Sequence, residues 1–199
     1  MRCYRPILRA LAIIVWLSVG QTAFGAADTY VTDTSHTLVG FTVRHLVISK
    51  VRGKFNDFTG TITYDEQDIT KSALQGSIKV SSIDTDNEKR DKHLRSADFF
   101  DVENHPEITF ASKRIEKKDD GYVMIGDLTI RGVTKEVEMP FALTGKMTHQ
   151  GKTRIGFEAS LRINRKDFGV AYHKVTDSGG LVVSDTVDIE LIGEAIKVS

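Results

Sequence analysis

The stretch NEKRDKHLRSADFFDVENHPEITFAS, residues 87–112, is the densest run of chemically specific residues in the chain. Its first half predicts a short helix, at about residues 86–96, in a sequence that otherwise favours strands. Leu94, Phe99 and Phe100 give this segment an apolar underside, and a helix with one apolar side buries that side against a neighbouring element. We therefore expect the segment to lie across a β-structure as a plug or lid.

Two residue pairs predict how this helix is held. Thr85 and Glu88 have the spacing of a capping box, in which each side chain satisfies an amide of the first turn. Asp91 precedes Arg95 by four residues, which is the favourable order for an ion pair on a helix. Pro106 ends the segment, because the residue before a proline is held extended. The next strand is expected to begin directly after it.

From residue 28 onward, apolar and polar residues alternate, which is typical of strands with one buried face. The turn signals between the strands include residues 119–121, Arg131-Gly132 and residues 178–180, and a two-residue turn at Arg131-Gly132 predicts a tight hairpin. The apolar positions of the alternation are Val39, Phe41 and Val43, then Phe58, Ile62 and Tyr64, Leu74, Ile78 and Val80, Ile108 and Phe110, Tyr122, Met124, Leu128 and Ile130, Val137, Met139, Phe141 and Leu143, Ile155, Phe157, Ala159, Leu161 and Ile163, and finally Val187, Ile189 and Leu191.

This pattern predicts about eight antiparallel strands in a single domain, residues 28–199. Long strands in one short domain are better explained by closure into a barrel than by an open sheet with two exposed edges. We therefore predict an all-β fold, an eight-stranded antiparallel barrel with one short helix between strands. An eight-stranded barrel has an interior that its side chains just fill or that holds one small ligand. The sequence pattern leaves both alternatives open.

The N-terminal residues predict a secretory signal peptide, residues 1–25, with cleavage after residue 25 or 27. A basic start with Arg2, Arg5 and Arg9 precedes an apolar run over residues 10–19, and small residues follow it. The apolar run is shorter than the roughly 20 residues that span a membrane. We therefore expect an exported, periplasmic protein with no transmembrane segment in the mature chain.

Removal of the signal peptide also changes the composition. It takes away basic residues and no acidic ones, so a chain with 27 residues of each sign becomes slightly acidic. A slightly acidic surface without a basic block argues against nucleic acid as a partner. Cys3, the only cysteine, lies within the signal peptide, so the mature domain has no disulfide.

The candidate polar site consists of histidines and of charged residues of the helix. His36 and His45 are nine residues apart in one extended run, so a regular strand places them on opposite faces. No metal-binding spacing of histidines is present, and we expect no metal site and no cofactor. Arg90, Asp91 and Arg95 either bind an anionic head group or form part of a salt-bridged helix surface. His45 and His93 are interpreted as hydrogen-bonded groups at the barrel rim or under the lid.

The sequence shows no arrangement typical of an enzyme. It contains no GxSxG motif and no cysteine nucleophile in the mature chain. The triplet Asp167-Phe168-Gly169 lacks the other kinase motifs, and NRKDFG is interpreted as a turn that ends a strand. We therefore expect a binding protein and not an enzyme.

Six blocks of the sequence resemble the YceI family. They are DTSHTLVGFTVRH (residues 33–45), VRGKFNDFTGTI (51–62), SSIDTDNEKRDKHLRSADFF (81–100), HPEITFAS (105–112), GDLTIRGVTKEV (126–137) and INRKDFG (163–169). The resemblance implies an exported bacterial protein with a lipocalin-like barrel, YceI-like throughout residues 28–199. It also implies a polyisoprenoid or similar long-chain amphipathic lipid as partner, and it is compatible with a homodimer.

With this resemblance, the leading hypothesis is that the protein binds, carries or sequesters such a lipid. The alternatives are an enzyme that uses His93, Asp91 and Arg90 with His45 on a prenyl or lipid substrate, and a structural or stress protein without ligand. The expected head-group or rim residues are His45, Arg90, Asp91 and His93, and His36 is a further family-matching position. The expected cavity-lining residues are Val39, Phe41, Val43, Phe58, Ile78, Val80, Leu94, Phe99, Phe100, Phe110, Met124, Leu128, Phe141, Phe157, Leu161 and Ile189.

Overall fold

The computed structural model describes residues 27–46, 48–173 and 182–198. The predicted signal peptide, residues 1–25, and the predicted turn at residues 178–180 lie outside the described residues. Within the described ranges, no helix is both long and apolar enough to cross a membrane.

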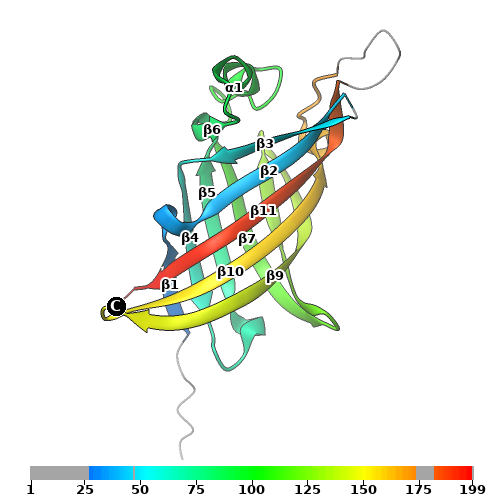
Figure 1. Ribbon diagram of the computed structural model, residues 1–199. Coiled ribbons are helices and arrows are strands. Elements are labelled where there is room, and N and C mark those ends of the chain that lie inside the picture. The colour runs from blue at the N-terminus through cyan, green and yellow to red at the C-terminus, as the bar shows by residue number, and fades with distance from the viewer. Residues whose placement is uncertain (1–26, 47, 174–181, 199) are drawn as a thin grey trace, which may run out of the picture.

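Eight antiparallel strands form a closed ring (Figure 1). β1 pairs with β4 on one side and with β11 on the other, and this second pairing closes the sheet. The predicted eight-stranded antiparallel barrel with one short helix is therefore confirmed. In the order of the ring, the strands are β1 (Asp28–Thr32), β4 (Phe58–Tyr64), β5 (Ala73–Lys79), β7 (Glu107–Lys118), β8 (Gly121–Ile130), β9 (Val133–His149), β10 (Lys152–Asn164) and β11 (Val183–Lys197).

Three further strands extend the sheet at the end of the barrel that carries the helix (Figure 1). β2 (Leu38–His45) follows β1 after the short 3-10 turn η1 (Thr34–His36), and both strands pair with β11 along different parts of its length. β3 (Ser49–Phe55) returns along β2 and pairs with the short β6 (Ile83–Asp84). The alternation in the sequence does not identify β3 and β6 as strands. β3 carries Gly53 where an apolar side chain would continue the series.

The hairpin between β8 and β9 turns as predicted. Ile130 and Val133 are paired, so Arg131 and Gly132 form a two-residue loop. Both residues have positive φ angles, 49° and 72°, as in the tight turns whose twist matches that of the flanking strands. The remaining connections include the 3-10 turns η2 (Ile69–Lys71), η3 (Val80–Ser82) and η4 (Arg165–Phe168).

The helix α1 (Glu88–Arg95) begins at a different cap from the predicted one. Asn87 is its N-cap, and the Asn87 side chain accepts a hydrogen bond from the Arg90 backbone amide at 2.9 Å. The predicted capping box at Thr85 is therefore wrong. Asp86 has φ 58°, a left-handed conformation that separates Thr85 from the helix. The helix therefore begins only after Asp86, with Asn87 as its N-cap.

The predicted ion pair between Asp91 and Arg95 is also wrong, because both side chains bond elsewhere. Asp91 is only 6% exposed and accepts hydrogen bonds from the backbone amide and the hydroxyl of Thr85. Arg95 donates to the carbonyl oxygens of Ser81 and Ile83, both at 2.9 Å. These bonds join the helix to the segment before it, and so they fix α1 over the end of the barrel.

The buried apolar residues lie inside the barrel and under the helix. The largest cluster combines strand residues such as Phe55 and Phe58 with Phe99 from the segment after α1 and with Phe168 from η4. Burial of each such side chain contributes roughly 1.5–3 kcal/mol to folding. The helical segment is therefore part of the core and not an appendage.

Candidate functional site

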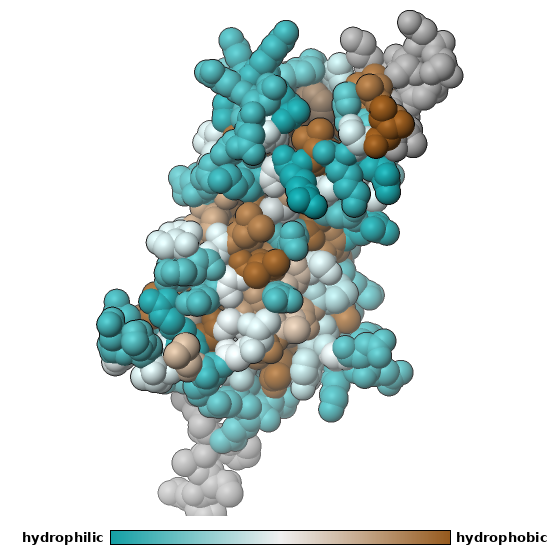
Figure 2. Space-filling model, viewed as in Figure 1, coloured by the Kyte–Doolittle hydropathy of each residue, from teal (hydrophilic) through white to brown (hydrophobic). Residues whose placement is uncertain are grey.

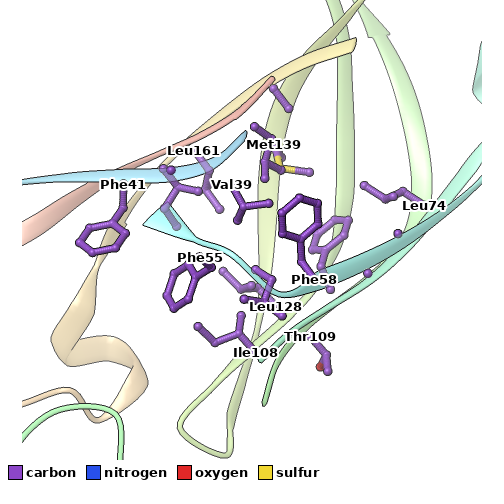
Figure 3. A pocket seen from close by; sticks show the side chains of 18 of the residues that line it. Val39, Phe41, Phe55, Phe58, Leu74, Ile108, Thr109, Leu128, Met139 and Leu161 are labelled. Carbon is purple, nitrogen blue, oxygen red and sulfur yellow. The ribbon is translucent and has the colours of Figure 1, made fainter. Parts of the chain in front are cut away.

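The barrel encloses a cavity of about 260 Å³. Its wall consists almost wholly of apolar side chains from the inward faces of the strands (Figure 3). The residues that Figure 3 labels are Val39, Phe41, Phe55, Phe58, Leu74, Ile108, Thr109, Leu128, Met139 and Leu161. Such a wall offers burial to an apolar chain and few polar groups to orient it. The barrel interior is therefore not filled by its own side chains.

A second pocket, of about 240 Å³, lies at the end of the barrel under α1, and we call it the mouth pocket. It shares the lining residues Phe41, Val43, Leu94, Phe99 and Val183 with the apolar cavity, so the two spaces adjoin. Its lining also includes the polar residues Arg44, His45, Thr85, Arg90 and His93. The arrangement is therefore an apolar cavity next to a pocket with polar groups in its wall.

All of the predicted cavity-lining residues except Val80 line the apolar cavity. Val80 is buried in η3 and packs in the core cluster with Phe55 and Ile83. Its place differs from the prediction because β5 ends at Lys79, so the strand alternation does not continue to residue 80.

Some lining residues were missed because no periodic signal identifies them. Phe55 belongs to β3, which was not recognised as a strand. Phe168 and Val170 lie in and after η4, and Tyr172 follows in a segment without regular structure. NRKDFG does form the predicted turn, with Gly169 at φ 75°. The turn, however, also brings Phe168 into the cavity wall.

Arg90 lines the mouth pocket and is held in place by Thr85. The Arg90 Nε donates to the Thr85 hydroxyl at 2.7 Å, and its Nη2 donates to the Thr85 carbonyl oxygen at 2.6 Å. The same hydroxyl donates to Asp91, so Thr85 links the guanidinium to the buried carboxylate. Asp91 lines neither cavity. Of the two helix residues, only Arg90 lines the mouth pocket, and Asp91 joins the helix to the segment before it.

His45 and His93 both line the mouth pocket. The His93 Nε2 lies 2.8 Å from Asp98 Oδ2. Its ring packs edge-to-face against Phe99 and Tyr172, at centroid distances of 5.0 and 5.2 Å. Neither imidazole is hydrogen-bonded to a serine or threonine hydroxyl in the part of the chain that the structure describes. The two histidines thus add polar groups to the lining of the mouth pocket, and among the described residues neither forms a nucleophile–base pair with a hydroxyl.

His36 lies outside both cavities, in an ion-pair cluster on η1. The Arg154 guanidinium donates to Asp33 at 2.6 Å and to Glu194 at 3.2 Å, and His36 Nδ1 lies 3.1 Å from Asp33. Mainly because of the hydrogen bond from Arg154, the pKa of Asp33 falls from 3.8 to about 2. Asp33, His36 and Glu194 are close enough together to share a cation, but Arg154 already supplies the positive charge.

Arg165 is a buried cation in the cavity wall. It is 5% exposed and donates to the carbonyl oxygens of Val170 and Ser184, at 2.6 and 3.0 Å, and to the carboxylate of Asp185 at 3.0 Å. Burial lowers the pKa of its guanidinium from the usual value, and the Asp185 charge opposes this effect. These bonds tie η4 to the start of β11, and so they hold the wall beside the mouth pocket.

Known proteins share both the sequence and the fold. A family model described as the YceI-like domain matches residues 30–195. A UPF0312 protein of Serratia proteamaculans is 40% identical over 191 residues, which cover 94% of each chain. The YCEI protein of Campylobacter jejuni superimposes with a TM-score of 0.68 at 34% identity, covering 78% of this chain and 90% of that one. A polyisoprenoid binding domain from Saccharophagus degradans has the same fold, with a TM-score of 0.64 at 14% identity, covering 86% of this chain and 99% of that one. Since the family model spans most of its length, the chain belongs to the YceI family.

Proposed function

We propose that the protein binds a long-chain isoprenoid or a similar amphipathic lipid, and that it carries or sequesters this lipid without changing it chemically. The observation that carries the proposal is the apolar cavity that adjoins a pocket with a polar rim. The lipid tail occupies the apolar cavity, and the head group lies in the mouth pocket near His45, Arg90 and His93. The polyisoprenoid binding domain with the same fold supports this choice of ligand.

The energetics favour exchange with a membrane over capture from water. Each methylene removed from water contributes about 0.8 kcal/mol, so a long chain in water would bind very tightly. A chain that arrives from a membrane is already surrounded by apolar groups, and its transfer into the barrel is nearly neutral. Selectivity then depends on the length of the cavity and on the polar groups at the mouth. A lipid too long for about 260 Å³ extends into the mouth pocket.

The cellular setting belongs to the same proposal. A signal peptide at residues 1–25 would deliver the mature domain, residues 28–199, to the periplasm, where a carrier could move lipid between membranes. A homodimer is compatible with the outer face of the barrel, on which Leu38 and Ile192 are paired and exposed. Figure 2 shows apolar side chains gathered on this side of the molecule.

The direct test is organic extraction of gently purified protein, followed by mass spectrometry, with native mass spectrometry of the intact sample. The proposal predicts about one apolar lipid per barrel and a measurable mass for any dimer. Protein that repeatedly contains no such lipid, and that takes up no polyprenol from detergent solution, contradicts the proposal.

A substitution of His45 tests whether the rim of the mouth pocket contacts the lipid head group. His45→Gln keeps a polar side chain of similar size, and the His45 ring makes no hydrogen bond to a described residue that the change would break. We expect it to weaken binding of a prenyl phosphate about fivefold and to leave binding of the uncharged prenol unchanged, because charge-assisted hydrogen bonds act only on the phosphate. His149→Gln, near the β9–β10 turn, is the matched control. Equal loss for both lipids would contradict a head-group role for His45.

A further inference from the structure

The hairpin of β2 and β3 ends in exposed apolar side chains. Ile48 is 86% exposed, the highest value among the exposed large hydrophobic residues of the described chain, and Leu46 is 38% exposed. Leu46 has φ 51°, an unfavourable conformation for a branched side chain, and its backbone amide donates to the Val182 carbonyl oxygen at 2.9 Å. The fold thus leaves Ile48 almost fully exposed and Leu46 partly exposed at the tip of the hairpin.

Basic side chains flank this tip on the outer face of the hairpin. Arg44 lies directly opposite Lys50, and Arg52 is two residues further along the same face. All three are exposed, and none forms an ion pair with a residue in the described ranges. Lys54, the next residue on this face, does pair with Asp84, at 3.8 Å. The end of the hairpin is therefore a cationic surface on a mature chain that is slightly acidic overall.

The same hairpin forms one wall of the mouth pocket. Val43, Arg44, His45 and Val51 all line that pocket. In Figure 1, β2 and β3 meet at the end of the barrel that carries α1, far from the β9–β10 turn. Figure 2 shows apolar side chains there beside hydrophilic ones. Any surface that covers the tip of the hairpin therefore also covers the neighbourhood of the mouth.

We propose that this hairpin tip docks the protein on an anionic lipid bilayer. Leu46 and Ile48 enter the boundary between head groups and acyl chains, and Arg44, Lys50 and Arg52 contact lipid phosphates. A bilayer offers an apolar layer for the exposed apolar side chains and anionic phosphates for the basic ones. Apolar side chains bind at its interface, and each basic residue near an anionic surface strengthens the attraction. Docking places the mouth pocket at the membrane. This role in lipid exchange rests on the proposed function, but the docking itself does not.

The test is flotation of the mature protein with vesicles made of equal parts phosphatidylglycerol and phosphatidylcholine, and with vesicles of phosphatidylcholine alone. We expect binding to the anionic vesicles that weakens as salt is raised. Ile48→Asp is expected to reduce the partition coefficient at least tenfold. Lys50→Glu together with Arg52→Glu should reduce it by a similar factor, since each lost basic residue accounts for about fivefold.

Matched controls lie at the opposite hairpin. Met147 is 60% exposed near the β9–β10 turn, and Lys152 is exposed beside it, so Met147→Asp and Lys152→Glu should leave vesicle binding within twofold. Circular dichroism checks that each variant is folded. The proposal is overturned if wild-type protein does not float or if Ile48→Asp protein floats equally well. A hairpin that binds a protein partner instead of a bilayer would give wild-type protein that does not float. Retention of lipid by a barrel that fails to float would refute docking and leave the proposed function standing.

Discussion

The ring of Phe41 lies over Gly53, its direct partner across β2 and β3. A Cβ built on Gly53 would overlap this ring and come within 2.8 Å of Thr85 Cγ2. Phe41 lines both the apolar cavity and the mouth pocket. Because Gly53 has no side chain, the Phe41 ring can lie between the apolar cavity and the mouth pocket.

We predict that Gly53→Ala forces Phe41 to move and lowers the free energy of unfolding by about 1–3 kcal/mol, the usual cost of overpacking. Urea denaturation measures the change. Gly145→Ala, on β9, is the matched control, because no atom lies within 4 Å of its added Cβ. If the two variants lost equal stability, Phe41 would not be confined by Gly53.

Thr85 joins the helix to the barrel through two charged side chains. Thr85→Val removes the hydroxyl that accepts from Arg90 and donates to the buried Asp91. Since a buried carboxylate then loses a hydrogen bond, we expect the free energy of unfolding to fall by about 1–3 kcal/mol. A double-mutant cycle with Asp91→Asn should show coupling, whereas the cycle with the exposed Asp120→Asn should not. Additive effects of Thr85→Val and Asp91→Asn would contradict the link.

Asp33 should make stability depend on pH in the acid range. Its pKa is about 2 in the folded protein and 3.8 ordinarily, so its contribution is complete above the ordinary value. The contribution declines as pH falls below about 4, and it is lost only once the pH is below about 2, where the carboxyl is protonated in the folded protein as well. We expect Asp33 to contribute about 1–2 kcal/mol to the free energy of unfolding above about pH 4. This is less than its pKa shift alone implies, because Arg154 is partly solvated.

The check compares urea denaturation at several pH values. Asp33→Asn should flatten the acid decline, and Arg154→Met should have the same effect because it removes the main cause of the shift. Asp120→Asn, in the exposed β7–β8 turn, is the control and should leave the decline unchanged. An unaltered decline in Asp33→Asn would show that other carboxylates cause it.

Tyr30 is fully buried, and its hydroxyl has no hydrogen-bond partner among the described residues. Burial of a hydroxyl without a partner is unfavourable, so Tyr30→Phe should leave stability unchanged or raise it by up to about 1 kcal/mol. Thermal unfolding followed by circular dichroism measures this effect. A loss of more than about 1 kcal/mol would mean that the hydroxyl is hydrogen-bonded in solution, for example to a buried water.

The barrel was predictable because each of its strands has one buried face, and the alternation of apolar and polar residues in the sequence shows which residues lie on that face. Met124 and Leu161 were placed in this way. The caps and ion pairs of α1 were not predictable, because spacing alone does not show that Asp86 adopts a left-handed conformation. The mouth pocket was predicted only in part. Tyr172 carries no local signal, since its position depends on contacts with residues distant in sequence.

We propose that the lipid lies inside the barrel, and substitutions of two alanines on neighbouring strands test this position. Ala159 faces the cavity on β10, whereas Ala142 is exposed on β9, where it pairs with the adjacent Glu158. Native mass spectrometry after incubation with a polyprenol measures occupancy, and Leu143→Trp is a second blocking variant if Ala159→Phe does not fold. We predict that Ala159→Phe loses the bound lipid and that Ala142→Phe retains about one per barrel. Equal occupancy in the two folded variants would contradict a lipid held in this cavity.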